Sequence, residues 1–372
     1  MNTSIHHKGT PVSEFMKNDD SVLLAAVDDI RAQRKAAGLD GLVGGLEALI
    51  ITTEPERLKP AVAELLATTG HDVSAAFSHG DQDVCVLSQE GSADLLVQAR
   101  TNGANPFLPF NRGAKTAAVP NTRLETFVFK CRNVKEYFNL QRGRGVAFLD
   151  DRVFDTPNYL FVQTMPSRFT GNSVGLVEWK NKESDYVIPG SRPLNLDVVK
   201  PDKPFLKNIK ELDHVAARVR AEERDVAILE FMSLTGYDFQ FAVYVDFLNS
   251  ITNVARLSPD DYAQVFTSGI APFTTPEESG PTELFIHNYG ARGHHMAFIT
   301  ENIEETVAAL MADGVGFLSD LVGSREEGLK QVFTRMSPNT LLVNEYIHRY
   351  DGFDGFFTKS NVTLLTKSTL NQ

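Results

Sequence analysis

Cysteine is scarce in this sequence, with only Cys85 and Cys131 among 372 residues. The two do not form a CxxC pair, and two thiols cannot supply a disulfide framework or a four-thiolate zinc site. Because so few cysteines are typical of proteins kept in a reducing compartment, we expect a cytoplasmic protein.

Long hydrophobic runs and an excess of positive charge are lacking as well. No apolar stretch approaches the roughly 18 residues needed to span a bilayer, and residues 1–15 contain no apolar core of a secretion signal. The formal net charge of −12 disfavours nucleic acid and anionic membranes as partners, because both repel negative charge. We therefore expect neither as a partner of this chain, which is long enough for two domains.

What the sequence does contain is internal similarity. Residues 126–149 and 295–318 align without a gap and read as strand, amphipathic helix, Gly-Val turn and strand. Residues 46–70 and 212–236 share a second pattern, in which an apolar strand leads through a turn to a helix that ends at Thr-Gly. The chain thus predicts four similar units, two in each half, and an α+β fold.

The remaining segments suggest how these units are arranged. A proline-punctuated run at 188–205 reads as a linker, and residues 12–37 read as one amphipathic helix. The predicted divisions are an N-terminal helical extension at residues 1–40, a first half at 41–200, and a second half with a C-terminal helix at 201–372.

Two histidines and a glutamate occupy matching places in the second half. His214 lies in the strand ELDHVAARV, His295 in GHHMAFIT and Glu345 in TLLVNEYIHRY, too far apart in sequence to meet unless their strands pair. Two imidazoles and one carboxylate on one side of a metal leave three adjacent positions open, as in non-haem iron(II) oxygenases. We predict that these residues bind Fe(II).

The first half has Ala48, Thr126 and Glu178 at the positions that the repeat assigns to the same three residues. A single carboxylate cannot hold the metal, so we expect this half to be structural. Strand alternation places His294 on the face opposite His295. We therefore expect His294 to pack beside the ligands or to support them, without binding the same ion.

In motif order the chain resembles the vicinal-oxygen-chelate superfamily, and within it the 4-hydroxyphenylpyruvate dioxygenase and hydroxymandelate synthase family. The motifs are IKELDHVAARV, GARGHHMAFITENIEETVAALMADGVGFL, LKQVFTR and NEYIHRYDGFDGFF. The likeness covers 205–372 well and the first half loosely. It implies four βαβββ modules that form two open barrels, with terminal helices added.

The resemblance also implies a function and a set of site residues. The cofactor would be Fe(II), and the reaction an oxidative decarboxylation by O₂ of a chelating 2-oxo acid similar to 4-hydroxyphenylpyruvate. Self-association is a further expectation from the resemblance. The implied ligands are His214, His295 and Glu345, and the implied substrate contacts are Gln331, Phe333, Phe353, Phe357 and His294, the last in place of the family's glutamine.

Other functions stay open from the sequence alone. Extradiol cleavage of a catechol would use the same metal set, but it needs another acid or base beside the metal. The nearest residues for that task are His287 and His294. A metal-dependent lyase or isomerase with Zn²⁺, Mn²⁺ or Co²⁺, and a protein that only binds a small acid, are the remaining alternatives.

Overall fold

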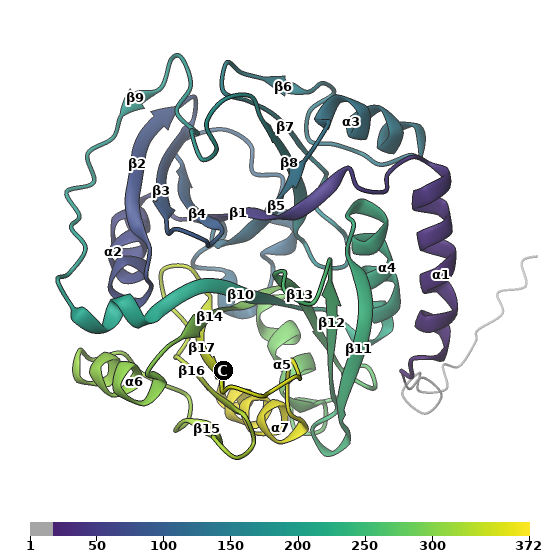
Figure 1. Ribbon diagram of the computed structural model, residues 1–372, viewed down its shortest axis with the longest axis vertical. Coiled ribbons are helices and arrows are strands. Elements are labelled where there is room, and N and C mark those ends of the chain that lie inside the picture. The colour runs from purple at the N-terminus through teal and green to yellow at the C-terminus, as the bar shows by residue number, and fades with distance from the viewer. Residues whose placement is uncertain (1–17) are drawn as a thin grey trace, which may run out of the picture.

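Two curved mixed sheets form the centre of the protein, one in the upper and one in the lower part of Figure 1. We describe residues 18–372 of a computed structural model. Helices lie along the outside of the sheets and between them (Figure 1). The helices are α1 (Ser21–Ala36), α2 (Leu58–Thr68), α3 (Val134–Gly143), α4 (Arg224–Leu234), α5 (Gly280–Tyr289), α6 (Ile303–Ala312) and α7 (Lys359–Ser368).

The first sheet has the strand order β6-β7-β8-β5-β1-β4-β3-β2-β9. Its strands are β1 (Val43–Thr53), β2 (Asp72–His79), β3 (Gln82–Ser88), β4 (Asp94–Arg100), β5 (Arg123–Cys131), β6 (Phe154–Asp155), β7 (Tyr159–Gln163), β8 (Ser173–Trp179) and β9 (Arg192–Pro193). The short β9 pairs with β2, so part of the predicted linker extends this sheet.

The second sheet has the order β11-β12-β13-β10-β14-β17-β16-β15. Its strands are β10 (Ile209–Arg218), β11 (Asp238–Val245), β12 (Ser250–Arg256), β13 (Ala263–Ser268), β14 (Arg292–Thr300), β15 (Val322–Ser324), β16 (Leu329–Phe333) and β17 (Val343–Arg349). Both sheets place their central pair antiparallel, with a parallel neighbour on each side. The predicted α+β class is confirmed.

Strand register agrees between the central pairs of the two sheets. Ala48 pairs with Val128 in the first sheet, and His214 pairs with Ala297 in the second. The helices that follow β5 and β14 are each succeeded by a glycine with φ of +89°, Gly145 and Gly314. A left-handed residue favours glycine because no Cβ meets the backbone there. This agreement supports the interpretation of the halves as two copies of one plan.

The N-terminal helix is shorter than the sequence pattern suggested. It begins at Ser21, and residues 12–17 of the predicted helix lie outside the described residues. Arg34 of α1 is buried, donates to the Tyr237 carbonyl oxygen at 2.9 Å and pairs with Asp238 at 2.8 Å. These bonds fix α1 to the end of α4 and the start of β11. No described helix is long and apolar enough to span a membrane.

Two tyrosines tie the halves together at helix ends. The Tyr346 hydroxyl donates to the carbonyl oxygen of Thr68 at 2.8 Å, and the Tyr137 hydroxyl donates to that of Leu234 at 2.7 Å. Thr68 and Leu234 are the last residues of α2 and α4, where carbonyls have no partner within the helix. One hydrophobic core cluster runs through both halves around these contacts.

Tyr346→Phe should therefore lower the free energy of unfolding by about 1–2 kcal/mol, because it leaves a buried carbonyl without its donor. Tyr350→Phe is the matched control, since the Tyr350 hydroxyl reaches only the exposed Glu304, and its effect should stay within about 0.5 kcal/mol. Denaturant titration measures both, and equal effects would contradict the structural role given to Tyr346.

Candidate metal centre

Three neighbouring strands bring His214, His295 and Glu345 to one face of the second sheet. On β14, Ala297 pairs with His214 of β10 on one side and with Glu345 of β17 on the other. The three residues thus form a row, and the Ala297 methyl group leaves space between the two longer side chains. His295 lies two residues before Ala297 on β14 and shares its face. All three polar side chains are buried.

The donor atoms of this trio have the separations that one metal ion requires. Nε2 of His214 is 3.1 Å from Oε2 of Glu345, and Nε2 of His295 is 3.3 Å from the same oxygen. All three atoms lie within 4.8 Å of one another. Two ligands bound at about 2.1 Å and at a right angle would lie about 3 Å apart. Although buried, the Nε2 of His214 makes no hydrogen bond, which fits an atom directed at a shared ion.

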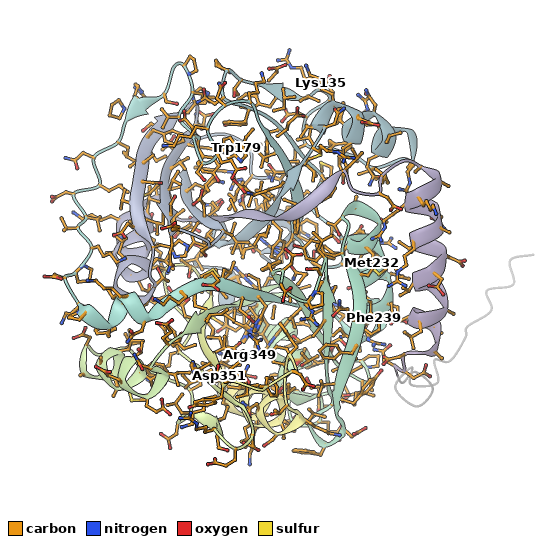
Figure 2. All side chains as sticks on the ribbon, viewed as in Figure 1. Lys135, Trp179, Met232, Phe239, Arg349 and Asp351 are labelled. Atoms are coloured by element: carbon orange, nitrogen blue, oxygen red, sulfur yellow. The ribbon has the colours of Figure 1, made fainter. Side chains whose placement is uncertain are left out.

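An aspartate fixes the ring of His214. Nδ1 of His214 lies 2.6 Å from Oδ2 of Asp213, so it carries the hydrogen and leaves the Nε2 lone pair free for a metal. Arg349, labelled near the middle of the second half in Figure 2, holds both oxygens of Asp213 at 2.5 and 3.1 Å. Burial opposes the charged form of Asp213, but His214 and Arg349 outweigh it and lower its pKa.

The second histidine is fixed by its neighbour in the chain. Nδ1 of His295 is 2.8 Å from Nδ1 of His294, and Nε2 of His294 is 2.8 Å from Oε1 of Gln372. The amide oxygen accepts only, so His294 donates from Nε2 and accepts at Nδ1. His295 must then donate from Nδ1, which again leaves its Nε2 lone pair for the metal. This assignment follows from the hydrogen-bond partners.

The carboxylate is oriented in the same way. Gln331 donates from Nε2 to Oε1 of Glu345 at 2.5 Å, which leaves Oε2 to face the histidines. Asn361 of α7 donates to the amide oxygen of Gln331 at 3.0 Å. The C-terminal helix is thereby connected to the metal centre through two side-chain amides.

Charge in the site is unevenly divided between the two histidines. Burial disfavours the charged form of His214, but the carboxylates of Glu345 and Asp213 outweigh it and raise its pKa to about 9. Burial, followed by repulsion from His294, His214 and Arg218, holds the pKa of His295 well below its usual value. At neutral pH an incoming metal ion must therefore displace one proton, from His214.

The cavity around the trio is small and is covered by the C-terminal helix. Its volume is about 50 Å³, and α7 contributes Val362, Leu365 and Thr366 to its wall. Four of the expected substrate contacts, Gln331, Phe333, Phe357 and His294, line it. Phe353 is not part of the lining and packs against Gly328 and Gly355. Instead Phe356 approaches His214, with ring centroids 5.6 Å apart.

Strict strand alternation fails at His294. Ala216 pairs with His295 while Ala217 pairs with Gly293, so His294 is the extra residue of a β-bulge. The bulge turns His294 toward the same cavity as His295. The first sheet has the same irregularity, since Ile50 pairs with Thr126 and Ile51 with Leu124, which makes Glu125 the extra residue.

The first-half counterpart of Glu345 is also different from the predicted one. Val128 pairs with Gly175 just as Ala297 pairs with Glu345, so Gly175 and not Glu178 is the equivalent residue. An added Cβ on Gly175 would lie 3.0 Å from the Phe161 ring. Glu178 instead accepts the Val134 backbone N–H at 2.8 Å, at the start of α3. The first half thus keeps no carboxylate at any of the three matching positions.

Sequence reasoning missed the residues that orient the ligands. Asp213, Arg349 and Asn361 were not predicted, although the adjacency of Asp213 and His214 was a usable signal. Arg349 and Asn361 gave no such signal, because they reach the site only through the pairing of β17 and the docking of α7.

The comparisons with known proteins concern the fold. No protein-family profile and no curated protein matches the sequence. A triple mutant of 4-hydroxymandelate synthase from Streptomyces coelicolor is similar in structure, with a TM-score of 0.65 and 16% identity over 88% of this chain and 98% of that one. A second similar structure is a xylose isomerase-like TIM barrel/4-hydroxyphenylpyruvate dioxygenase fusion protein, with a TM-score of 0.59 and 14% identity.

The match with the fusion protein covers 93% of this chain but only 58% of the other, so this chain spans under two thirds of its length. Together the matches show a two-domain vicinal-oxygen-chelate fold. More particularly, the fold is similar to that of 4-hydroxymandelate synthase and to that of part of the fusion protein. The predicted structural resemblance to this group is confirmed, at an identity that marks a divergent chain.

Metal binding at pH 7 should release about one proton per ion, because His214 begins protonated and His295 does not. The apparent affinity should rise about tenfold per pH unit until pH reaches about 9 and then level off. Calorimetric titration in buffers of different ionisation enthalpy measures the released proton. Heats that do not depend on the buffer would contradict the assignment.

Asp213→Asn should weaken metal binding about 10- to 100-fold, because the amide can no longer hold the Nδ1 hydrogen of His214 with a charge-assisted bond. Glu178→Gln removes a carboxylate of the first half and should leave metal affinity unchanged. A fluorescence competition assay with a chelator compares the two variants, and similar losses in both would show that Asp213 has no special relation to the metal.

Proposed function

We propose that this protein is a non-haem Fe(II) dioxygenase that acts on a 2-oxo acid. The observation that carries the proposal is the buried trio of His214, His295 and Glu345, whose free donor atoms face one another at metal-ligand separations. A site with only three protein ligands leaves room for substrate and O₂ together. The similar structures, a synthase and a fusion that contains a dioxygenase, support the same class of enzyme.

The donor set suits iron. Two neutral imidazoles and one carboxylate form the ligand set of non-haem Fe(II) oxygenases, whereas four-thiolate or all-oxygen sites favour other metals. When bound, Fe(II) would supply the reduction of O₂ and the oxidative decarboxylation of a chelating 2-oxo acid. The chain has three tasks, which are to hold the ligands, to orient the substrate and to exclude water.

Each of these tasks has residues in place. Asp213, His294 and Gln331 keep the ligand lone pairs directed at the metal position. Phe333 lies with its ring centroid 4.7 Å from that of His295, and Phe357 lies 5.2 Å from that of His214. These rings exclude water from the metal position on two sides. A dry site strengthens the electrostatic interactions within it.

Extradiol cleavage receives no support from the described residues. His294 uses both ring nitrogens in hydrogen bonds, to His295 and to Gln372. His287 is not part of the cavity lining and stacks on Phe273 with ring centroids 4.4 Å apart. Neither histidine is free to serve as the additional acid or base.

The proposal extends to the organisation of the chain. We infer that residues 41–200 form a structural domain and residues 201–372 the catalytic one, built on one repeated plan. The partners would be a small-molecule substrate and O₂, in the cytoplasm and without nucleic acid or membrane. Self-association remains an expectation from the family resemblance.

The test is anaerobic reconstitution with one Fe(II) per chain, followed by addition of 2-oxo acids. Chelation by the keto acid should produce a weak visible absorption band, and admitting O₂ should then consume one O₂ per CO₂ released. Glu345→Ala should lose the band, and Glu178→Gln should retain it.

Three results would contradict the proposal. Iron uptake without a band or O₂ consumption with any 2-oxo acid excludes this reaction. A yellow ring-cleavage product from a catechol favours the extradiol alternative. No metal uptake at all favours a binding protein.

A further inference from the structure

A buried guanidinium that has no carboxylate partner among residues 18–372 lies in the wall of the metal cavity. Arg218, the last residue of β10, is 4% exposed and lines the cavity together with the metal-binding trio. Its protein partners are neutral, namely the Pro281 carbonyl oxygen at 3.2 Å and Thr369 Oγ1 at 3.1 Å. Its Cζ lies 4.5 Å from the centre of the Phe285 ring. Burial lowers the pKa of Arg218 to about 9, with no acidic group to offset it.

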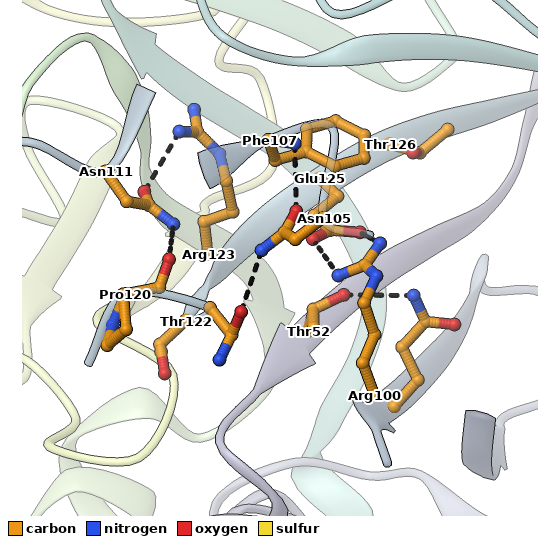
Figure 3. Close-up of polar contacts among 12 residues, drawn as sticks. Thr52, Arg100, Asn105, Phe107, Asn111, Pro120, Thr122, Arg123, Glu125 and Thr126 are labelled. Atoms are coloured by element: carbon orange, nitrogen blue, oxygen red, sulfur yellow. Dashed lines mark hydrogen bonds and ion pairs between the residues drawn. The ribbon is translucent and has the colours of Figure 1, made fainter. Parts of the chain in front are cut away.

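The first half shows how an arginine next to the bulge residue can be paired. Arg100 of β4 binds the two oxygens of Glu125 at 2.6 and 2.7 Å (Figure 3). Glu125 is the bulge residue of β5, and its counterpart in the second half is His294. Arg218 is not the counterpart of Arg100, because it lies on β10 where the first half has Thr52 of β1. The metal cavity nevertheless contains a buried arginine, and its bulge residue is an imidazole instead of a carboxylate. Charged groups that are buried without a partner are costly, so an anionic ligand would be bound strongly there.

The charges around the cavity lead to the same conclusion. Among the residues described as lining it, Glu345 is the one carboxylate and Arg218 the one guanidinium. Arg218 is near enough to His294 and His295 to lower the pKa of each. With a divalent ion bound to the trio, the cavity carries a net charge of about +2, counting one carboxylate and one guanidinium. A ligand with two negative charges neutralises it.

Hydroxyl groups are frequent in the wall of the cavity, and two of them lie beside Arg218. Thr267 is its pairing partner on β13, and Thr369 accepts its hydrogen bond. The hydroxyl residues of the wall are Ser250, Thr252, Thr267, Thr282, Thr366 and Thr369. Thr267 Oγ1 is buried and has no partner. A hydroxyl-lined wall with a guanidinium favours a charged group over the apolar body of an aromatic ring.

We propose, on the basis of the function proposed above, that Arg218 binds a second carboxylate and that the substrate is a compact 2-oxo dicarboxylate. One end of this acid would lie at the metal and the other at Arg218. The cavity of about 50 Å³ is far below the roughly 300–1,000 Å³ of sites for larger organic ligands. A planar carboxylate matches the donors that the guanidinium has left, whereas a phosphate group is bulkier and needs more donors.

The experiment compares acids of equal length on the chain loaded with Mn²⁺, so that binding is measured without turnover. Calorimetry gives the affinities for 2-oxoglutarate and 2-oxopentanoate, and for 2-oxoadipate and 2-oxohexanoate. In the wild type we expect the dicarboxylate of at least one pair to bind at least about tenfold more tightly, because a buried charge-assisted pair forms only with it. Equal affinities within both pairs would overturn the proposal, whatever any variant does.

Variants separate direct binding from a structural role. Arg218→Gln should reduce the ratio of affinities to about one by weakening dicarboxylate binding alone. Arg325→Gln removes an exposed guanidinium outside the cavity lining and should preserve the ratio. If Arg218→Gln weakens both acids of a pair equally, Arg218 only supports the fold of the cavity and the inference is wrong.

Further ligands distinguish this inference from the proposed function. The metal-loaded chain could prefer dicarboxylates and yet consume no O₂ after Fe(II) loading. This result would contradict the dioxygenase proposal and support the Arg218 site. Oxidation of 2-oxo monocarboxylates without any preference for dicarboxylates would support the dioxygenase proposal and contradict the Arg218 site. If 3-phosphonopyruvate binds more tightly than either dicarboxylate, the second group is a phosphonate or phosphate and the carboxylate assignment is wrong.

Discussion

The site depends on one lone pair from each of His214, His295 and Glu345, all three directed at the same position. The other polar atoms of these side chains are held in hydrogen bonds. The register of β10, β14 and β17 places His214 and Glu345 on either side of Ala297, with His295 two residues away on the same face. Strand register determines only the face of the sheet on which each side chain lies. Hydrogen bonds accepted by Asp213 and His294 and donated by Gln331 then decide which atom of each ligand is free.

Those supporting bonds also connect the site to the rest of the second half. Asp213 is held by Arg349, and Gln331 is held by Asn361 of α7. Gln372, which follows α7, completes the chain of bonds through His294. The docking of the C-terminal helix therefore helps to orient two of the three ligands, Glu345 and His295. A buried cluster of this polarity is costly unless each group is paired, so a bound ion would stabilise the folded state.

Much of the metal centre could be predicted from the sequence, and the predictions that were wrong share one cause. Periodicity and internal similarity were enough to place His214 and His295 on neighbouring strands, because both features are local. The equivalence of Glu178 with Glu345 was wrong, since Gly175 holds that place in the sheet. The face of His294 was misjudged because a bulge breaks the alternation. Sheet register and bulges depend on contacts between distant segments. The same contacts determine that Arg218 has no acidic partner among the described residues. A single sequence does not display any of them.

The most direct measurement of the central claim is anomalous diffraction at the iron absorption edge, from crystals loaded with Fe(II) without oxygen. The account predicts one peak per chain, about 2.0–2.3 Å from Nε2 of His214, Nε2 of His295 and Oε2 of Glu345. A peak elsewhere, or no peak while the three side chains turn away from one another, would contradict it.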